Sequence, residues 1–244
     1  MGSARIRRMR SQEAGGLHHS VLSRIGEDLV HDRVRAGDVL SMEQLEERYG
    51  VSRTVVREVV KVLESIGVAT SRRRVGVTFR PEHRWEALSP VVIRWRLEGP
   101  RRMDQLGEVS ELRRGIEPQA ARLAAERASA SDATLLLEAA EGMARTGPEG
   151  DLHAYLRHDI DFHRMLLSSS GNALLASFAP FVAEALTGRT DHDLMPDVPE
   201  QQAVDWHVEV ATAIADGHPG RAEETMRLIV SEAQQAMEDL HAAE

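Results

Sequence analysis

The sequence contains no cysteine, few aromatic residues and no long apolar run. Without cysteine, the chain can form neither disulfide bonds nor thiolate metal sites. With aromatic residues at only 4%, its cores must be built mainly from Leu, Val, Ala and Ile. No stretch approaches the roughly 18 apolar residues of a membrane-spanning helix, and the basic start leads into no apolar segment of a secretory signal. We therefore expect a cytoplasmic protein without a membrane partner.

Charge is distributed unevenly along the 244 residues, whose net charge is −9. Residues 1–80 hold 15 basic and 10 acidic side chains, a net of +5, and the remainder holds 15 basic and 29 acidic side chains, a net of −14. A basic head on an acidic body indicates a nucleic-acid-binding domain joined to a domain with another task. The alternative is chance drift of surface charge.

One stretch of the basic head, G-V-S-R-T-V-V-R-E-V-V from Gly50, predicts a turn followed by a short helix. Gly50 suits the left-handed end of one helix, and Ser52 is a good N-cap for the next. Arg53, Thr54 and Arg57 fall opposite a valine face, near the helix start. Two arginines and a hydroxyl there suit phosphates and guanine edges in a DNA major groove. The alternative is an ordinary surface helix with solvated arginines.

The residues before this stretch predict two further helices. An apolar stripe at helical spacing marks a first helix at about 19–31. Ser41 and Gln44 form a capping box for a second helix at 42–49. The third helix, which starts in the stretch itself, runs on to Gly67. Two short helices joined at G-V-S make a helix-turn-helix.

The residues after the third helix predict a hairpin and a linker. In 68–80, β-branched residues flank an arginine-rich centre that includes Arg73 and Arg74, which indicates a small cationic wing. Such a tip would lie in or over a minor groove. Pro81 marks the boundary. Within residues 83–99, Ser89 can cap a helix with Pro90 at its first position, and this helix would link the head to the body.

The rest of the chain predicts an antiparallel helical bundle, because glycine and proline punctuate helical segments and no strand pattern competes. The expected helices run over about 103–128, 131–146, 150–170, 172–188, 200–217 and 219–242.

Three helices of the bundle carry candidate chemistry. Arg113 and Glu117 lie four residues apart, so they form a surface ion pair, or Arg113 points inward and clamps a ligand carboxylate. Asp159 and His163 share one helix face and can share a divalent metal, although an ion pair is the commoner outcome of this spacing. His207 is a third possible ligand. A hydrolytic metal centre is conceivable, but the chain has no Gly-rich phosphate loop and no nucleophile elbow.

Residues 18–80 resemble the winged helix of the GntR family of bacterial repressors. The resemblance rests on R-V-R-A-G-D-V-L followed by E-Q-L-E-E-R-Y-G-V-S-R-T-V-V-R-E-V-V-K-V-L-E-S-I-G-V. It implies that Arg53 and Arg57 read bases and phosphates. Arg74 departs from the family pattern, because a glycine is common at that wing position. The DNA-binding residues that we expect are Arg35, Ser52, Arg53, Thr54, Arg57, Arg73 and Arg74.

The bundle resembles the FCD ligand-binding domain of the FadR branch of this family, through E-L-R-R-G-I-E-P, D-I-D-F-H-R-M-L-L-S-S-S-G-N-A-L-L and W-H-V-E-V-A-T-A-I-A-D-G. Members that bind a metal use an Asp, a His four residues on and two later histidines. Asp159, His163 and His207 match the first three, and Ile229 replaces the fourth. The resemblance leaves two alternatives: a three-ligand Zn, Ni or Mn site completed by water or effector, and a metal-free pocket in which Asp159 and His163 hydrogen-bond the effector.

The sequence therefore predicts a mainly α protein with four parts. A disordered tail spans 1–17 and a winged helix-turn-helix domain of three helices plus a small β-hairpin spans 18–80. A linker helix spans 81–100. An all-α antiparallel bundle, the FCD-type ligand-binding domain, spans 101–244.

We interpret the protein as a repressor that binds double-stranded, palindromic operator DNA as a homodimer and releases it on binding a small anionic carboxylate. The effector would bind through Arg113, near Asp159, His163 and His207. Asn172 would line the pocket or merely start a helix. R-W-E-A-L-S-P-V-V-I-R-W is similar to the linker of members that respond to sugar acids such as galactonate or gluconate. Other members of the family sense lactate, acyl-CoA or dicarboxylates. The alternatives are a metal-dependent hydrolytic enzyme and a ligand-binding bundle that does not bind DNA.

Overall fold

The computed structural model describes residues 20–192 and 194–242, and it divides into two compact units, Met1–Pro100 and Arg101–Glu244. The tail predicted over 1–17 and the predicted start of the first helix lie outside the described residues.

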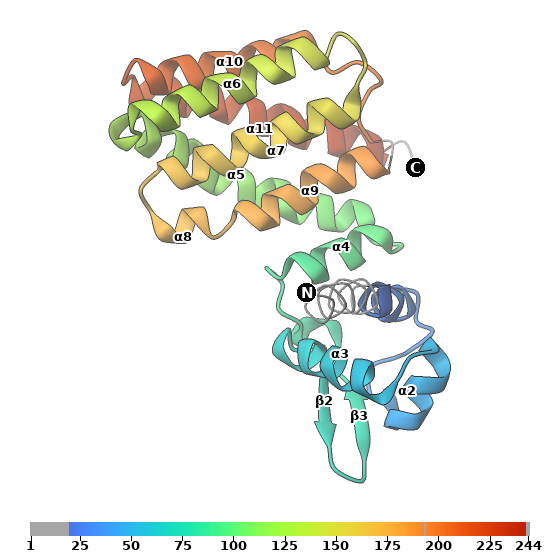
Figure 1. Ribbon diagram of the computed structural model, residues 1–244. Helices are drawn as coiled ribbons and strands as arrows, with labels where there is room; N and C mark the ends of the chain where they lie inside the picture. Colours follow the sequence, from blue (N-terminus) through green and yellow to red (C-terminus); the bar gives the residue numbers. More distant parts are fainter. Residues whose placement is uncertain (1–19, 193, 243–244) are drawn as a thin grey trace, which may run out of the picture. The chain divides into compact units, whose positions relative to one another are not determined.

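The first unit contains the predicted helix-turn-helix (Figure 1). Residues 20–30 are helical, and α2 (Met42–Tyr49) and α3 (Arg53–Ser65) follow. The predicted capping box of α2 is confirmed, because the Ser41 amide donates to the Gln44 side chain at 2.7 Å and the Ser41 hydroxyl accepts from the Gln44 amide at 3.2 Å. Gly50 ends α2 with a φ of 67°, in the left-handed region that glycine tolerates without a Cβ penalty.

The N-cap of α3 differs in part from the prediction. Ser52 occupies the N-cap position with an extended backbone, but its hydroxyl makes no capping hydrogen bond. The valine face is buried as predicted, with Val56, Val59 and Val60 in the core of the first unit. The orientation of α3 therefore depends on this apolar face rather than on its cap.

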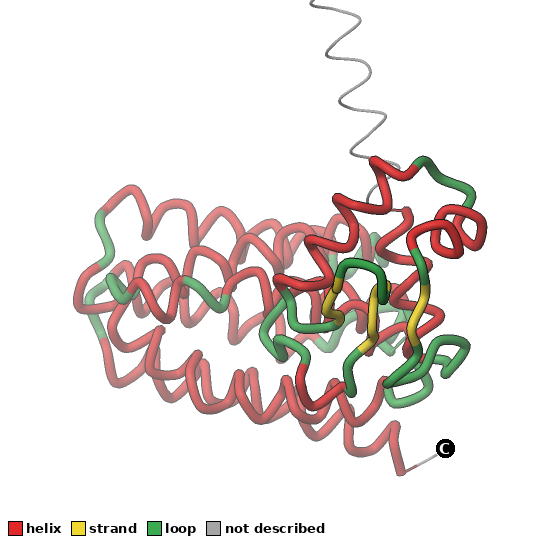
Figure 2. Tube along the Cα trace, turned by 90° about the horizontal axis from the view of Figure 1, so that it is seen from below, coloured by secondary structure: helices red, strands yellow, loops and turns green. Residues whose placement is uncertain are grey.

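The wing is a hairpin of β2 (Ala69–Arg72) and β3 (Gly76–Phe79), and it projects beyond α3 in Figure 1. The prediction missed a third strand, β1 (Val39–Leu40), which pairs antiparallel with β3 and gives the strand order β1-β3-β2. Two residues are too few for the alternating pattern that identifies a strand in a sequence. Figure 2 shows this small sheet among a chain that is otherwise helix and loop.

The predicted linker contains α4 (Pro90–Glu98), which belongs to the first unit. Val92 and Trp95 of α4 are buried in the same core as the valines of α3. Gly26 makes room for this packing, because a Cβ on that residue would lie 2.2 Å from the Trp95 ring. The apolar face of α4 thus completes the core of the head.

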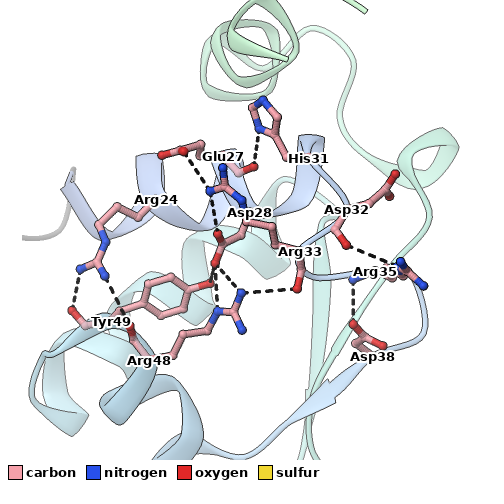
Figure 3. Close-up of polar contacts among 10 residues, drawn as sticks. All are labelled: Arg24, Glu27, Asp28, His31, Asp32, Arg33, Arg35, Asp38, Arg48 and Tyr49. Carbon is pink, nitrogen blue, oxygen red and sulfur yellow. Dashed lines mark hydrogen bonds and ion pairs between the residues drawn. The ribbon is translucent and has the colours of Figure 1, made fainter. Parts of the chain in front are cut away.

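A polar cluster ties α2 to the helical residues 20–30 (Figure 3). Arg48 Nε and the Tyr49 hydroxyl both donate to Asp28 Oδ2, at 2.9 and 3.0 Å, and Arg24 donates to the Tyr49 carbonyl at 2.8 Å. Burial acts to raise the pKa of Asp28, but the hydrogen bonds from Arg48 and Tyr49 outweigh it and the pKa is lowered. The ionised Asp28 therefore orients the helix that precedes the turn into α3.

The second unit is the predicted helical bundle, in which α7 packs against α5, α6 and α9 (Figure 1). Alanines of α5, including Ala120, Ala121 and Ala124, are fully buried and allow close approach of α11. Within the described ranges, no helix is long and apolar enough to cross a bilayer. The helices of this unit are α5 (Arg102–Arg127), α6 (Ala130–Thr146), α7 (Leu152–Ser169), α8 (Ala173–Ala176), α9 (Ala179–Asp191), α10 (Gln201–Ala215) and α11 (Pro219–Ala242).

The prediction of one helix over 172–188 is wrong, because the segment divides into α8 and α9. Ser177 closes α8 by donating its hydroxyl to the Leu174 carbonyl at 2.7 Å. Pro180 lies in the first turn of α9, where its missing N–H costs nothing. Pro180, which stands inside an apolar pattern of helical spacing, thus marks the start of a new helix.

Candidate DNA interface and effector site

The start of α3 presents polar side chains to solvent. Arg53, Thr54 and Arg57 are exposed, and Val56 and Val59 on the opposite face are buried. The structure therefore confirms that this helix has an apolar face and a cationic face, as predicted.

A groove runs between this face of α3 and the wing. Arg73 and Arg74 are exposed at the turn between β2 and β3. Arg74 has a φ of 65°, a backbone conformation that residues other than glycine rarely adopt. The cationic residues that line the groove are Arg53, Arg57, Lys61, Arg72, Arg73 and Arg74.

The arginines of this groove differ in their partners. Arg53 Nη1 lies 2.8 Å from Glu43 Oε1, whereas Arg57 has no ion pair or hydrogen bond among the described residues. Arg35, which does not line the groove, is exposed and donates from Nε to the Asp32 carbonyl at 3.3 Å. A free Arg57 and a partly neutralised Arg53 make a surface that suits phosphates.

In the second unit, a cavity of about 70 Å³ lies among α5, α7, α9, α10 and α11. The segment before α10 forms part of its wall through Leu194, Pro196 and Pro199. The polar residues that line the cavity are Arg113, Tyr155, Asp159, His163, Arg189, Glu200, His207 and Glu232.

Three of these residues form the donor cluster that the sequence predicted. Asp159 and His163 come from adjacent turns of α7, and His207 comes from α10. Asp159 Oδ1 lies 3.2 Å from His163 Nε2 and 3.7 Å from His207 Nε2. One ligand atom from each residue lies within 4.8 Å of the others, and all three residues are buried.

The protonation states of this cluster follow from its surroundings. Burial lowers the pKa of His207 to about 4, so the imidazole is neutral at pH 7. Burial by itself would raise the pKa of Asp159, but His163 and His207 lower it to about 2. His207 Nδ1 lies 2.7 Å from the Ala203 carbonyl, which can only accept, so Nδ1 carries the proton. His207 Nε2 therefore faces the cluster with a free lone pair.

Arg113 and Glu117 form an ion pair, but it is not on the surface. Both side chains are buried, with 2.8 Å between Arg113 Nε and Glu117 Oε1 and 3.3 Å between Arg113 Nη2 and Glu117 Oε2. Glu117 Oε2 also lies 3.0 Å from His163 Nδ1. Of the two alternatives that the spacing left open, the surface pair is excluded, because this face of α5 packs into the bundle. Spacing along a helix cannot show that burial.

Two family models match the chain in its two units. The FCD domain matches residues 108–232, and the model described as bacterial regulatory proteins, gntR family, matches residues 17–79. The chain belongs to the gntR family and carries an FCD domain. It is a DNA-binding transcription regulator rather than an enzyme.

Relatives of this gntR-family chain are regulators too. The galactonate operon transcriptional repressor of Escherichia coli is 32% identical over 62% of this chain and 66% of its own length, just under two thirds. The HTH-type transcriptional regulator LutR of Bacillus subtilis is 28% identical over 79% of this chain and 88% of its length. The solved structure of Lar, which controls expression of the Listeria monocytogenes agr system, has a TM-score of 0.58 at 15% identity and covers 91% of this chain and 97% of that one. That likeness shows the fold.

The donors in the FCD cavity fit a divalent cation. Asp159 Oδ1 and His207 Nε2 are buried without hydrogen-bond partners within the described residues. A buried carboxylate oxygen and a buried imidazole nitrogen left unpaired are costly unless an ion or water satisfies them. Glu117 beside His163 and the Ala203 carbonyl at His207 are the outer partners that metal-binding histidines use. Ile229 lines the same cavity, at the position that the resemblance assigns to a fourth ligand.

The structure brings Arg113 together with the cluster but places Asn172 elsewhere. Asn172 accepts from the Leu174 amide at 3.0 Å and begins α8, and it does not line the cavity. Sequence reasoning missed Arg189, Tyr155 and Glu232, which do. These three carry no motif in the sequence, so only the packing of α7, α9 and α11 reveals them.

Proposed function

We propose that this regulator represses transcription by binding a two-fold operator as a homodimer, and that a small carboxylate such as a sugar acid releases it. The observation that carries the proposal is the FCD cavity with Asp159, His163 and His207 on its wall. The E. coli relative is named as the repressor of a galactonate operon, which supports both the sign of regulation and the class of effector.

On the DNA side, the start of α3 supplies the base contacts and the wing supplies phosphate contacts. Arg57 is exposed and has no partner among the described residues, so it can approach a guanine edge or a phosphate without losing one of those contacts. Arg35, Ser52 and Thr54 are also exposed and would add polar contacts to the DNA. One short helix reads few base pairs, so two copies on a palindrome give the needed specificity.

On the effector side, Asp159, His163 and His207 hold a divalent cation, with water or the effector completing the site. When bound, that cation supplies positive charge for a carboxylate. Glu117 orients His163, and the Ala203 carbonyl keeps His207 in the tautomer that binds. Without a cation, ionised Asp159 would repel a carboxylate, which favours the metal alternative over the metal-free one.

Release of the operator by the effector requires the FCD cavity to change shape. Its volume of about 70 Å³ is well below the roughly 300 Å³ at which small-molecule pockets begin. Between α9 and α10 the wall is a non-helical segment with Pro196 and Pro199, which leads into the helix that carries His207, so a shift of this segment would widen the cavity and move His207. An effector that binds only the widened form shifts the population toward it, and this couples effector and operator affinity reciprocally.

A DNA-binding assay tests the proposal directly. The protein is titrated onto its own upstream DNA at several salt concentrations, with and without galactonate. We expect salt-sensitive binding that galactonate weakens and that Arg57→Ala abolishes. Arg145→Ala, an exposed arginine of the FCD domain, is the matched control and should bind normally. Binding that is insensitive to salt and to Arg57 would contradict the DNA-reading role, and binding unaffected by any sugar acid would contradict the effector class.

Metal content tests the cation site separately. Protein purified without a nickel column is analysed for zinc, nickel and manganese and then titrated with each metal. We expect about one equivalent per chain in the wild type and none in Asp159→Asn. A wild-type protein that neither retains nor binds any of the three metals would exclude the metal site and leave the DNA result standing.

A further inference from the structure

The two arginines of the FCD cavity, Arg113 and Arg189, differ in what already binds them. Arg113 donates from Nε and Nη2 to the two carboxylate oxygens of Glu117, at 2.8 and 3.3 Å. The same Nη2 lies 3.1 Å from His163 Nε2. A ligand carboxylate that took over Arg113 would have to leave Glu117 buried and unpaired, which is costly.

Arg189 lies in the last turn of α9 and has no such partner. Its Nε is buried and makes no hydrogen bond, and it forms no ion pair with any acid of the described residues. Burial and the nearby charge of Arg113 lower the pKa of Arg189. A buried guanidinium nitrogen is seldom left in this state, because its desolvation needs a partner to offset it.

We propose that Arg189, and not Arg113, binds the carboxylate of the effector. This rests on the proposed function and adds the residue that makes the site selective for an acid. A guanidinium offers two parallel N–H groups to a carboxylate, in a geometry that lysine cannot reproduce. Arg113 then acts inside the protein, where it compensates Glu117 and contacts His163.

Glu232 is the alternative partner of Arg189. It lines the same cavity from α11, and its charge acts on Arg189, although no ion pair within 4.0 Å joins the two. If Arg189 served only to balance Glu232, removal of the Glu232 charge would weaken the fold. If Arg189 binds the effector, that removal frees the arginine and strengthens the binding of an anion.

The test measures galactonate binding by calorimetry in the full chain. The variants are Arg189→Met, Arg189→Lys and Glu232→Gln, and the urea midpoint of each reports its stability. We expect Arg189→Met to bind galactonate about 10- to 100-fold more weakly. Arg189→Lys should recover part of the loss. Glu232→Gln should bind at least as tightly as the wild type. All three should keep the wild-type urea midpoint and, without galactonate, the wild-type operator affinity.

Two results would overturn the inference and spare the proposed function: wild-type galactonate affinity in Arg189→Met, or a fall in affinity that follows a fall in the urea midpoint in all three variants. Failure of the wild type to bind galactonate or gluconate would instead overturn the sugar-acid proposal and this inference with it.

Discussion

Arg113 and Glu117 face each other across one turn of α5, with 2.8 Å between Nε and Oε1 and with both side chains buried. Glu117→Gln leaves the buried guanidinium without its counter-charge. We expect the free energy of unfolding of the FCD domain to fall by about 3–5 kcal/mol, measured by urea denaturation. Glu126→Gln, which removes the nearer of the two acidic partners of the exposed Arg122 on the same helix, should cost under about 1 kcal/mol. Equal effects would show that burial does not strengthen the pair.

The same carboxylate predicts a pH dependence. Burial acts to raise the pKa of Glu117, but Arg113 and His163 outweigh it and hold the pKa at about 2, below its ordinary value of 4.5. A depressed folded-state pKa stabilises the fold above pH 4.5, and the contribution is lost as the pH falls through 2. The stability difference between wild type and Glu117→Gln should therefore be constant near neutrality and shrink below pH 4.5. Urea titrations at pH 7, 5 and 3.5 check this, and a difference that grows on acidification would refute it.

Gly76 of β3 has a φ of 119°, and a Cβ on it would lie 2.6 Å from the Leu40 carbonyl oxygen of β1. Gly76→Ala thus combines backbone strain with a clash, and we expect a loss of roughly 2–3 kcal/mol in the head. Gly37→Ala is the control, because it has a φ of 91° and open space around the added carbon. It should cost only the strain, about 1–2 kcal/mol. Thermal unfolding of both variants separates the two contributions.

Glu43 competes with DNA for Arg53, since the two side chains lie 2.8 Å apart beside the groove of α3 and the wing. Glu43→Gln should raise affinity for non-specific DNA about two- to fivefold and steepen its salt dependence. Glu47→Gln removes the same charge from the same helix, α2, without releasing Arg53. If both variants gain equally, general charge and not the Arg53 pair explains the effect.

The substitution Arg74→Gly distinguishes the effect of backbone strain on stability from the effect of the Arg74 side chain on DNA binding. Glycine adopts its φ of 65° without penalty, so Arg74→Gly should leave the melting temperature unchanged or slightly raised. The salt dependence of operator binding should nevertheless fall, by about 0.9 in the slope of log K against log salt for one lost phosphate contact. An unchanged slope would mean that the wing tip does not touch a phosphate.

The local features of the head were accessible from the sequence, because short-range rules decide them. The capping box at Ser41, the left-handed Gly50 and the buried valine face of α3 each depend on residues within a few positions of one another. Strand β1 was missed because its two residues acquire strand geometry only by pairing with β3. The division of α8 from α9 was missed because apolar periodicity continues across the turn.

The effector site could be predicted only in part from short-range sequence rules. Helical spacing alone predicts that Asp159 and His163 share a helix face and that Arg113 can reach Glu117, because side chains four residues apart lie together on a helix. The packing of the bundle shows that these faces point inward, that His207 meets them, and that Arg189 enters the cavity with no hydrogen bond or ion pair among the described residues. Burial and long-range contact depend on how five helices pack, and the spacing of residues along one helix carries no information about that.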